Sequence, residues 1–420
     1  MAYKIPRGTQ DLLPGVSEKW QWVEAKFREW CRLYGYREVR TPVFEHTELF
    51  RRGVGETTDI VEKEMYSFQD RKGRDLTLRP EGTAGVVRAF VENKWYAEPQ
   101  PTKWYYMGPM FRYERPQAGR NRQFHQFGVE AFGSVDPYLD AEVIALGMRF
   151  FREAGLRGVT VQLNSVGDPE SRARYFEKLI EYFEPYKDEL AEEARGRLYK
   201  NPMRILDSKD PRTKEISAGA PSILDFLSEE AKRHFDRVKD ALTLLDIPFE
   251  LNDRLVRGLD YYTFTAFEYT VESKGSQAGS IGGGGRYNRL VAEIGGPDMP
   301  GIGFGIGVER VLLALEEQGV GVPGDAAVDC WLVTLGEEAD RAGVRILEDL
   351  RAAGLMAERD YMGRKLKAQF KQAERLGARF VAILGDEEWK NGQINVKNQT
   401  DGRQETISLD RLVEWLKEQV

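Results

Sequence analysis

The segment YMGPMFRYERPQAGRNRQFHQFGVEAFG, from Tyr106 to Gly133, decides the fold of this chain. It contains two runs typical of β-strands, MFRYERP and QFHQFGVEAFG, joined by a short basic loop at residues 117–122 that includes a glycine. Two strand-like runs around such a loop predict a β-hairpin.

Alternation of side chains along the two strands predicts a charged face on this hairpin. Arg112 and Glu114 fall on one side of the first run, and Gln126, Gly128 and Glu130 on one side of the second. A glycine inside a strand usually marks the close approach of a ligand or of another backbone. We interpret this face as a site for a small charged ligand; the alternative is a surface sheet with cross-strand ion pairs.

The composition is that of a folded protein with about two to three domains. Of its 420 residues, 41% are hydrophobic and 31% are charged, and the formal net charge is −7. The chain has no bilayer-length apolar run and no hydrophobic signal region, so we expect a cytoplasmic protein without membrane contact. Its two cysteines, Cys31 and Cys330, lie far apart, which fits a reducing compartment and argues against a zinc site.

A second motif, LTLRPEGT, ends at Thr83. The carboxylate of Glu81 beside the hydroxyl of Thr83 suits an ammonium group, and Gly82 between them allows access. The alternative is an ordinary turn, because Pro-Glu-Gly is a common turn sequence.

A third motif, LVRGLDYYTFTAFE, places Arg257 shortly before the adjacent residues Tyr261 and Tyr262. It offers one cationic clamp and two planar polar walls to a ligand. The alternative is a pair of buried tyrosines with satisfied hydroxyl groups.

Two glycine-rich stretches follow, GSIGGGG at 279–285 and GIGFGIG at 301–307. In the second, the glycines share one strand face and the apolar residues share the other, so bare backbone is offered to a flat aromatic group. Arg310 follows at the strand-to-helix junction, where a cation can reach a phosphate. Neither stretch has dinucleotide-binding or Walker spacing.

The domain organisation is predicted from composition and periodicity. We expect a catalytic domain at 1–167, a helical insertion at 168–235, the rest of the catalytic domain at 236–318, a linker at 319–325 and a small α/β domain at 326–420. In the last domain, six basic residues predict either a solvated helix face or a contact with an RNA backbone: Arg364, Lys365, Lys367, Lys371, Arg375 and Arg379.

These motifs together resemble the bacterial-type histidyl-tRNA synthetases of class II, over essentially the whole chain. FRYERP with FHQFGVEAFG resembles motif 2, GIGFGIGVERVLLAL resembles motif 3, and the helix and strand ending at Pro42 resemble the dimer-forming motif 1. LVRGLDYY and GGGGRYNRLV resemble the two histidine signatures, although Asn288 and Arg289 replace the usual Asp and Gly.

The resemblance implies an α+β fold: an antiparallel sheet flanked by helices, a helical insertion and a C-terminal α/β anticodon-binding domain. It implies a homodimer that activates L-histidine with ATP and magnesium and then charges the tRNA for histidine. It also implies that no general base and no protein-bound metal site is needed.

By matching position, the resemblance assigns roles to individual residues. Glu81 and Thr83, with Gly82, would hold the α-amino group of histidine. Around the rest of the amino acid, the lining would be Gln126, Glu130, Tyr261 and Tyr262. Arg112 and Arg257 would neutralise charge at the α-phosphate, and the rest of ATP would meet Glu114, Arg120 and Arg310.

Two alternatives remain. The first is a non-catalytic, histidine-sensing regulatory subunit of ATP phosphoribosyltransferase, which should lack the C-terminal anticodon-binding domain and the ATP-contacting arginines. The second is another class II synthetase, which would leave the RGLDYY motif without explanation.

Overall fold

The computed structural model describes residues 3–420 except 56–57, 257–258, 273–278 and 324–327. The chain forms two compact units, Met1–Pro323 and Gly324–Val420. The division falls inside the segment 319–325 that the sequence predicts to be a linker. No helix among the described residues is both long and apolar enough to cross a membrane.

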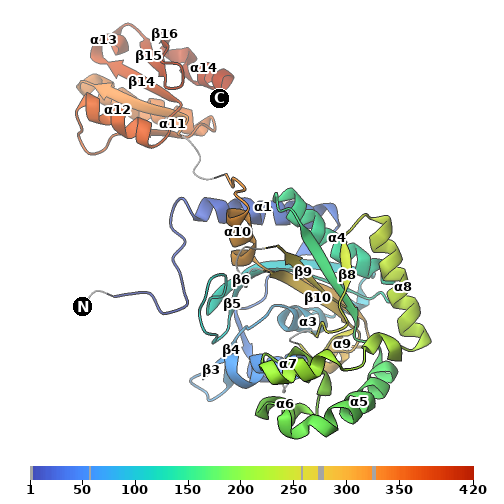
Figure 1. The fold of residues 1–420 in the computed structure, drawn as a ribbon. Helices are drawn as coiled ribbons and strands as arrows, with labels where there is room; N and C mark the ends of the chain where they lie inside the picture. Colours follow the sequence, from blue (N-terminus) through green and yellow to red (C-terminus); the bar gives the residue numbers. More distant parts are fainter. Residues whose placement is uncertain (1–2, 56–57, 257–258, 273–278, 324–327) are drawn as a thin grey trace. The chain divides into compact units, whose positions relative to one another are not determined.

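The first unit is built around an eight-stranded sheet with the order β1-β5-β6-β11-β10-β9-β7-β8 (Figure 1). β1 pairs with β5 and β7 with β8 in parallel, and the other neighbours are antiparallel. This largely antiparallel sheet confirms the predicted fold class. Its strands are β1 (Arg37–Glu38), β5 (Thr102–Phe111), β6 (Gln123–Phe132), β7 (Val159–Ser165), β8 (Phe249–Leu251), β9 (Thr263–Val271), β10 (Ser280–Tyr287) and β11 (Gly301–Gly307).

β5 and β6 form the predicted hairpin and are paired over their whole lengths. β5 ends at Phe111, however, so the prediction that Arg112 and Glu114 share a strand face is wrong. Beyond this strand end, the Arg112 N–H donates to the Arg122 carbonyl oxygen at 2.9 Å, and the Tyr113 N–H donates to the Glu64 carbonyl oxygen at 2.7 Å. The two charged residues therefore lie in the loop beyond the hairpin strand.

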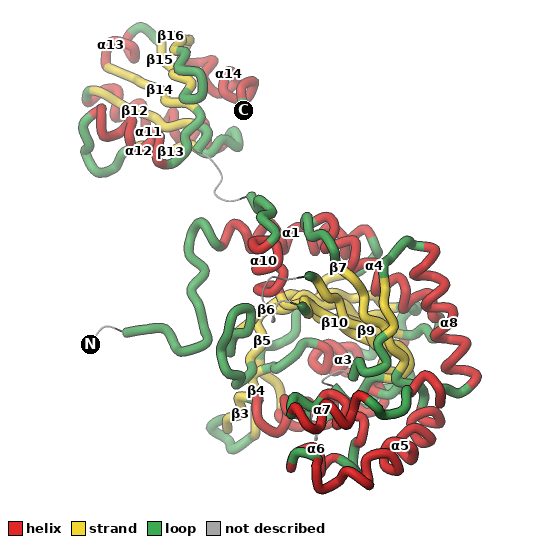
Figure 2. The backbone as a smooth tube through the Cα atoms, in the orientation of Figure 1, coloured by secondary structure: helices red, strands yellow, loops and turns green. Residues whose placement is uncertain are grey.

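Helices cover both faces of the sheet (Figure 2). On one face, alternate residues of β6 and β11, such as Phe127 and Phe304, enter a large apolar core with four helices. The intervening residues of both strands face the other side, where α3 lies. The covering helices are α1 (Ser17–Leu33), α4 (Pro137–Glu153), α8 (Glu229–Leu244), α10 (Val308–Glu317) and, on the second face, α3 (Thr83–Glu92).

A small three-stranded sheet and two short helical elements precede α3. The strand segment around Pro42 is split between β1 of the large sheet and the first strand of this small one. Pro42, between them, has no N–H to donate to a ladder. The elements are β2 (Phe44–His46), α2 (Thr47–Val54), η1 (Ile60–Glu64), β3 (Tyr66–Gln69) and β4 (Asp75–Leu78).

The predicted insertion is helical, and its two ends are tied together. Asp168, which caps α5, accepts the Ser228 hydroxyl at 2.5 Å, and Ser228 caps α8. α8 continues to Leu244 and packs on α4, so the predicted border at residue 235 lies inside a helix. The other elements are α5 (Pro169–Phe183), η3 (Glu184–Glu189), α6 (Glu192–Arg197), η4 (Pro202–Asp207), α7 (Pro211–Ala218) and η5 (Ile223–Phe226).

The second unit has a mixed five-stranded sheet with the order β13-β12-β14-β15-β16. Its two edge strands, β13 and β16, are short and have few apolar residues. The elements are β12 (Cys330–Leu335), α11 (Glu337–Ala352), β13 (Ala357–Arg359), α12 (Leu366–Arg375), β14 (Phe380–Gly385), α13 (Asp386–Lys390), β15 (Gln393–Asn398), β16 (Gln404–Ser408) and α14 (Leu412–Gln419).

Candidate active site

An arginine-lined cleft lies beside the end of the β5–β6 hairpin. Its lining includes five residues predicted for the site from separate motifs: Arg112, Glu114, Arg120, Gln126 and Arg310. The hairpin, its loop and the start of α10 supply them, so the structure brings these distant parts of the chain together.

Backbone carbonyl groups hold two arginines of the cleft in place, and the Glu114 carboxylate does not form close hydrogen bonds with Arg112 or Arg120. The Arg112 Nε–H donates to the Pro80 carbonyl oxygen at 2.8 Å, and Arg310 donates to that of Ser280 at 2.6 Å. Glu114 lies 3.8 Å from Arg112 and 3.6 Å from Arg120, beyond hydrogen-bonding distance. Within the described residues, this geometry leaves guanidinium donors for an incoming anion.

Burial and a neighbouring cation shape the state of Arg310. Burial lowers the pKa of its guanidinium, and the nearby positive charge of Arg120 lowers it further. A polyanion between the two arginines would relieve both costs, because it supplies negative charge and hydrogen-bond acceptors together. The surroundings of Arg310 therefore favour an anionic group beside it, although the cleft lining also includes Glu114, Glu268 and Glu309.

The glycine face of β11 is only partly bare. A Cβ at Gly303 would lie 2.0 Å from the Glu130 carboxylate, and one at Gly301 would lie 2.2 Å from the Tyr287 ring. At Gly305 and Gly307 the nearest side-chain atoms, from Gln126 and Arg310, would be 3.5 Å away. The floor predicted for a flat ligand therefore exists in the cleft half of the strand, whereas protein side chains cover the other half.

A buried cluster, which we call the dry cluster, lies on the same face of the sheet and contains Glu81, Thr83, Glu130 and Tyr287. The Thr83 hydroxyl donates to Glu130 at 2.7 Å, and the Tyr287 hydroxyl donates to its other oxygen. Burial raises the pKa of Glu130 to about 8, against the hydrogen bonds from Tyr287 and Thr83, which lower it. Glu81 accepts the backbone N–H groups of Thr83 and Ala84 at 2.6 and 2.9 Å, and burial raises its pKa as well.

The predicted tyrosine pair belongs to this cluster. The rings of Tyr261 and Tyr262 are 4.7 Å apart, and Tyr261 meets the Tyr287 ring at 5.5 Å. Both residues of the pair are 7% exposed. The structure thus places Glu81, Thr83 and Glu130 in one cluster with the two tyrosines.

Sequence reasoning missed Tyr106, whose ring fills the space above two of the predicted glycines. A Cβ at Gly82 or at Gly128 would lie 2.1 Å from that ring. Gly128 is therefore required by a protein side chain, and the inference that its empty position alone marks a ligand is corrected. The pairing register of the hairpin could have predicted this contact, because Tyr106 lies directly opposite Gly128.

Two family profiles match the chain. The profile described as Histidyl-tRNA synthetase matches residues 8–184 and 186–311, and the profile described as Anticodon binding domain matches residues 329–419. The chain belongs to the histidyl-tRNA synthetase family. The resemblance indicated by its motifs is confirmed.

Individual relatives match over the full length of this synthetase-family chain. The histidine–tRNA ligase of Bacillus velezensis is 57% identical over 419 residues, which is 99% of this chain and 99% of the relative. That of Geobacillus thermodenitrificans is 56% identical over 420 residues, 100% of this chain and 99% of the relative. The crystal structure of apo S. aureus histidyl-tRNA synthetase has 46% identity and a TM-score of 0.86, covering 99% of this chain and 100% of that one.

A more distant structure bears on the regulatory-subunit alternative. It is titled as an ATP phosphoribosyltransferase regulatory subunit/histidyl-tRNA synthetase from Bacillus halodurans, with 20% identity and a TM-score of 0.65 over 91% of this chain and 98% of that one. This likeness concerns the fold alone. The regulatory reading expects no anticodon-binding domain, so the profile match at 329–419 counts against it.

Arg257 lies outside the described residues. Arg112 and Arg310 line one cleft, whereas the position of Arg257 relative to them stays a prediction.

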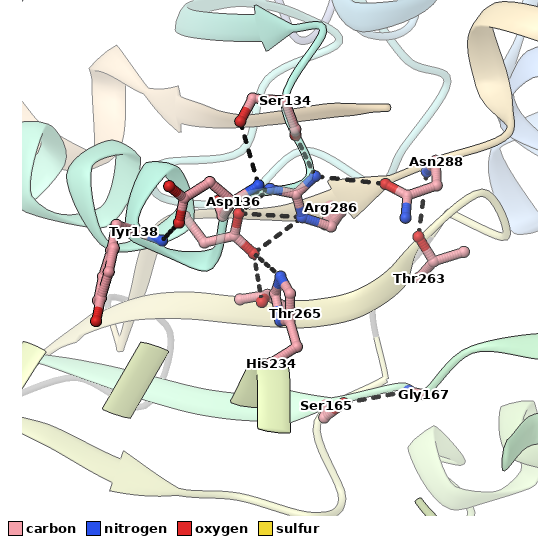
Figure 3. A network of polar contacts seen from close by, with 11 residues as sticks. Ser134, Asp136, Tyr138, Ser165, Gly167, His234, Thr263, Thr265, Arg286 and Asn288 are labelled. Carbon is pink, nitrogen blue, oxygen red and sulfur yellow. Dashed lines mark hydrogen bonds and ion pairs between the residues drawn. The ribbon is translucent and has the colours of Figure 1, made fainter. Parts of the chain in front are cut away.

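Arg286, in the second histidine signature, belongs to a network of polar contacts (Figure 3). The Arg286 Nε–H donates to Asp140 at 3.0 Å, and another guanidinium nitrogen donates to the Ser134 carbonyl oxygen at 2.8 Å. Thr265 also donates to Asp140, at 2.6 Å. Arg286 is 1% exposed, so this pair fixes the strand whose next residue, Tyr287, meets Glu130.

Two histidines have structural roles. The Nδ1 of His125 lies 3.1 Å from Glu309, and its ring packs on Trp20. His234 packs on Phe264, and burial lowers its pKa.

In the second unit, the basic run follows β13 and continues along α12. Arg364 pairs with Asp360 at 2.6 Å, whereas the charged residues of the helix are exposed and its inner face, with Ala373, is buried. The arrangement fits either alternative for this surface.

Proposed function

We propose that this chain catalyses the reaction after which its family is named, the two-step ligation of histidine to its tRNA. In the first step, a carboxylate oxygen of L-histidine attacks the α-phosphorus of ATP, the bond to the β-phosphate breaks, and pyrophosphate leaves. In the second, the histidyl group passes to the 3′-terminal ribose of the tRNA, and AMP is released. The observation that carries the proposal is the arginine cleft beside the dry Glu130 cluster on one face of one sheet.

The dry cluster is proposed to select histidine. Glu81 and Thr83, with Gly82 between them, would hold the α-amino group, and Tyr261 and Tyr262 would bound the imidazole. Glu130 would line the pocket within the cluster, and Gln126 would line it from the side of the cleft. A buried carboxylate with a raised pKa gains most from a ligand that brings N–H donors or positive charge. A site built on such pairs rejects an apolar analogue, because its polar groups would be left unpaired.

The arginine cleft is proposed to hold ATP. Arg112 and Arg257 would neutralise the charge that develops at the α-phosphate, and Arg310 would hold the γ-phosphate of a bent ATP. Glu114 and Arg120 would border the nucleotide. Displacement at phosphorus depends on positioning and charge neutralisation, so no general base is assigned.

Magnesium is proposed to accompany ATP. In the described residues, no group of three or more His, Cys, Asp or Glu side chains is placed to hold a metal ion. Mg²⁺ is commonly bound by one or two carboxylates together with substrate phosphates, and Glu114 and Glu268 line the cleft. When bound, the ion would neutralise charge on the phosphates.

The remaining assignments are also proposals. The unit from about residue 326 would bind tRNA, and the segment ending at Pro42 would take part in a homodimer, as its resemblance to motif 1 implies. A cytoplasmic location follows from the reaction itself, because tRNA charging supplies the ribosome.

The test is ATP–pyrophosphate exchange with each amino acid in turn, followed by charging of tRNA. Exchange that depends on histidine and on no other amino acid is expected. Histidine binding without exchange would favour the regulatory subunit, and exchange with another amino acid would favour a different class II synthetase.

A further inference from the structure

The helical insertion contacts the segment that carries the two tyrosines of the histidine signature. Arg204, in η4, places Nη2 at 2.7 Å and Nε at 3.1 Å from one oxygen of Asp260. The Asn201 side-chain amide donates to the same oxygen at 3.2 Å. Asp260 directly precedes Tyr261 and Tyr262, so the insertion holds the first residue of the pocket wall.

A second arginine of the insertion holds the other end of this wall. Arg172, in α5, donates to the carbonyl oxygen of Tyr262 at 3.1 Å. Burial lowers the pKa of its guanidinium, and it packs on the ring of Phe176. Two different helical elements of the insertion therefore clasp three consecutive residues of the signature.

The same residue, Asp260, also meets the segment that follows α2. Its N–H donates to the Val54 carbonyl oxygen at 3.1 Å, and a Cβ at Gly55 would lie 2.6 Å from its carboxylate. Asp260 is thus wedged between the insertion and the catalytic domain.

The insertion reaches that segment through α6 as well. Arg197 donates to Asp59 at 3.1 Å, and Lys63 donates to Glu193 at 3.3 Å. These pairs are exposed, so they contribute little by themselves. They show that the insertion lies along both segments that meet at Asp260.

The Arg204 contact differs from those surface pairs in burial. Arg204 is 8% exposed, and removing a guanidinium from water is costly unless it is paired and well hydrogen-bonded. Apolar packing alone could attach an insertion to a domain. The buried Arg204 guanidinium instead donates two hydrogen bonds to Asp260, the residue before the tyrosines. These bonds fix the direction in which the tyrosines leave the backbone.

We propose that Arg204 and Arg172 are positioning residues for histidine recognition, so that the insertion forms the outer support of the amino-acid pocket. The inference rests on the proposed function of Tyr261 and Tyr262. It predicts that loosening the clasp impairs binding of histidine and leaves binding of ATP unchanged, because the arginine cleft has no contact with these residues among those described.

The test compares Arg204→Met with Arg212→Met in the full-length protein. Arg212 lies in the same insertion, and it pairs with Glu189 and Glu215 at the surface. In pyrophosphate exchange, we expect Arg204→Met to raise KM for histidine about tenfold with KM for ATP within about twofold of wild type. Arg212→Met should match the wild type in both values.

Conservative and paired variants separate positioning from folding. Arg204→Lys should recover part of the loss, because it restores the charge without the fork. Asp260→Asn should act in the same direction, and the double variant Arg204→Met/Asp260→Asn should be no worse than the more impaired single variant.

Several outcomes would overturn the proposal. These are an unchanged KM for histidine in Arg204→Met, equal rises in both KM values, or additive losses in the double variant. If Arg204→Met does not fold, the same comparison is made with Arg204→Lys, judged by its melting curve. Histidine binding measured by calorimetry reads the pocket even if the wild type shows no exchange, which would count against the proposed function and leave this test intact.

Discussion

The cleft and the dry cluster share one sheet face but differ in solvent and in charge. The Arg120 side chain, in the cleft, is 40% exposed, whereas Glu130, in the cluster, is 0% exposed. β6 supplies both sites, because Gln126 lines the cleft and Glu130, four residues further, lies in the cluster at roughly 13 Å along the strand. A continuous strand can thus serve an open site for a hydrated polyanion and a closed site for a small, specific ligand.

The difference indicates where affinity and specificity arise. Open arginines attract any polyphosphate and act most strongly where charge develops during the reaction. Buried hydrogen-bonding groups penalise every ligand that fails to pair with them. Substitutions in the cleft should therefore change the rate, and substitutions in the cluster should change which amino acid binds and how stable the protein is.

The largest effect is expected at Arg112. Arg112→Ala should lower kcat for pyrophosphate exchange by about 10²–10³, as for other preorganised donors, with a smaller change in KM for histidine. Arg115→Ala, an exposed position in the same loop, is the matched control and should retain wild-type turnover. A normal kcat with only a raised KM would remove Arg112 from the chemical step. Arg257→Ala is expected to behave like Arg112→Ala.

The next effect tests how closely the cluster is packed. Gly128→Ala would put a methyl group 2.1 Å from the Tyr106 ring and should lower the free energy of unfolding by about 1–3 kcal/mol. Gly305, the partner of Gly128 on β11, is the matched control, because its Cβ would be 3.5 Å from the nearest atom. Gly305→Ala should leave the melting temperature close to wild type. Equal melting shifts would contradict the distinction between filled and open glycine positions.

The sequence predicted the parts of the fold that depend on periodicity. The apolar alternation of β6 and β11, seen in Phe127 and Phe304, gave the strands and their inner face correctly. Strand ends were harder to predict, because beyond the end of β5 at Phe111 the Tyr113 N–H bonds to the Glu64 carbonyl oxygen, a contact between distant segments.

The site was predictable where a motif carries its own chemistry. Arg112 was proposed as a charged group on the face of a strand-like run and Arg310 as a cation at a strand-to-helix junction, and both line the cleft. Tyr106 and Arg286 were missed, because a tyrosine opposite a glycine and an arginine paired with Asp140 are defined only by register and packing. The contact of Arg204 with Asp260 likewise joins residues that no local pattern connects.

A further effect follows from the raised pKa of Glu130. A carboxyl with a pKa near 8 in the folded protein and an ordinary, lower pKa in the unfolded chain contributes stability at low pH. This contribution is lost as the pH rises toward 8, with a slope of up to about 1.4 kcal/mol per pH unit, because over this range the unfolded chain has released the proton while the folded state still holds it. Unfolding free energies measured from pH 5 to 8.5 should therefore fall more steeply in wild type than in Glu130→Gln. Parallel curves would show that Glu130 titrates in its ordinary range.

The smallest effect extends the comparison to the second unit. If α12 contacts an RNA backbone, Lys367→Gln and Lys371→Gln should each weaken binding of tRNA slightly and reduce the slope of log affinity against log salt by about one. Pyrophosphate exchange should be unchanged in both. Lys417→Gln, an exposed substitution on α14, is the control and should leave the slope as it is. If Lys367→Gln and Lys371→Gln both keep the wild-type salt slope, as the control does, the basic run is a solvated helix face. Removing a phosphate contact would change the number of released counterions and therefore the slope.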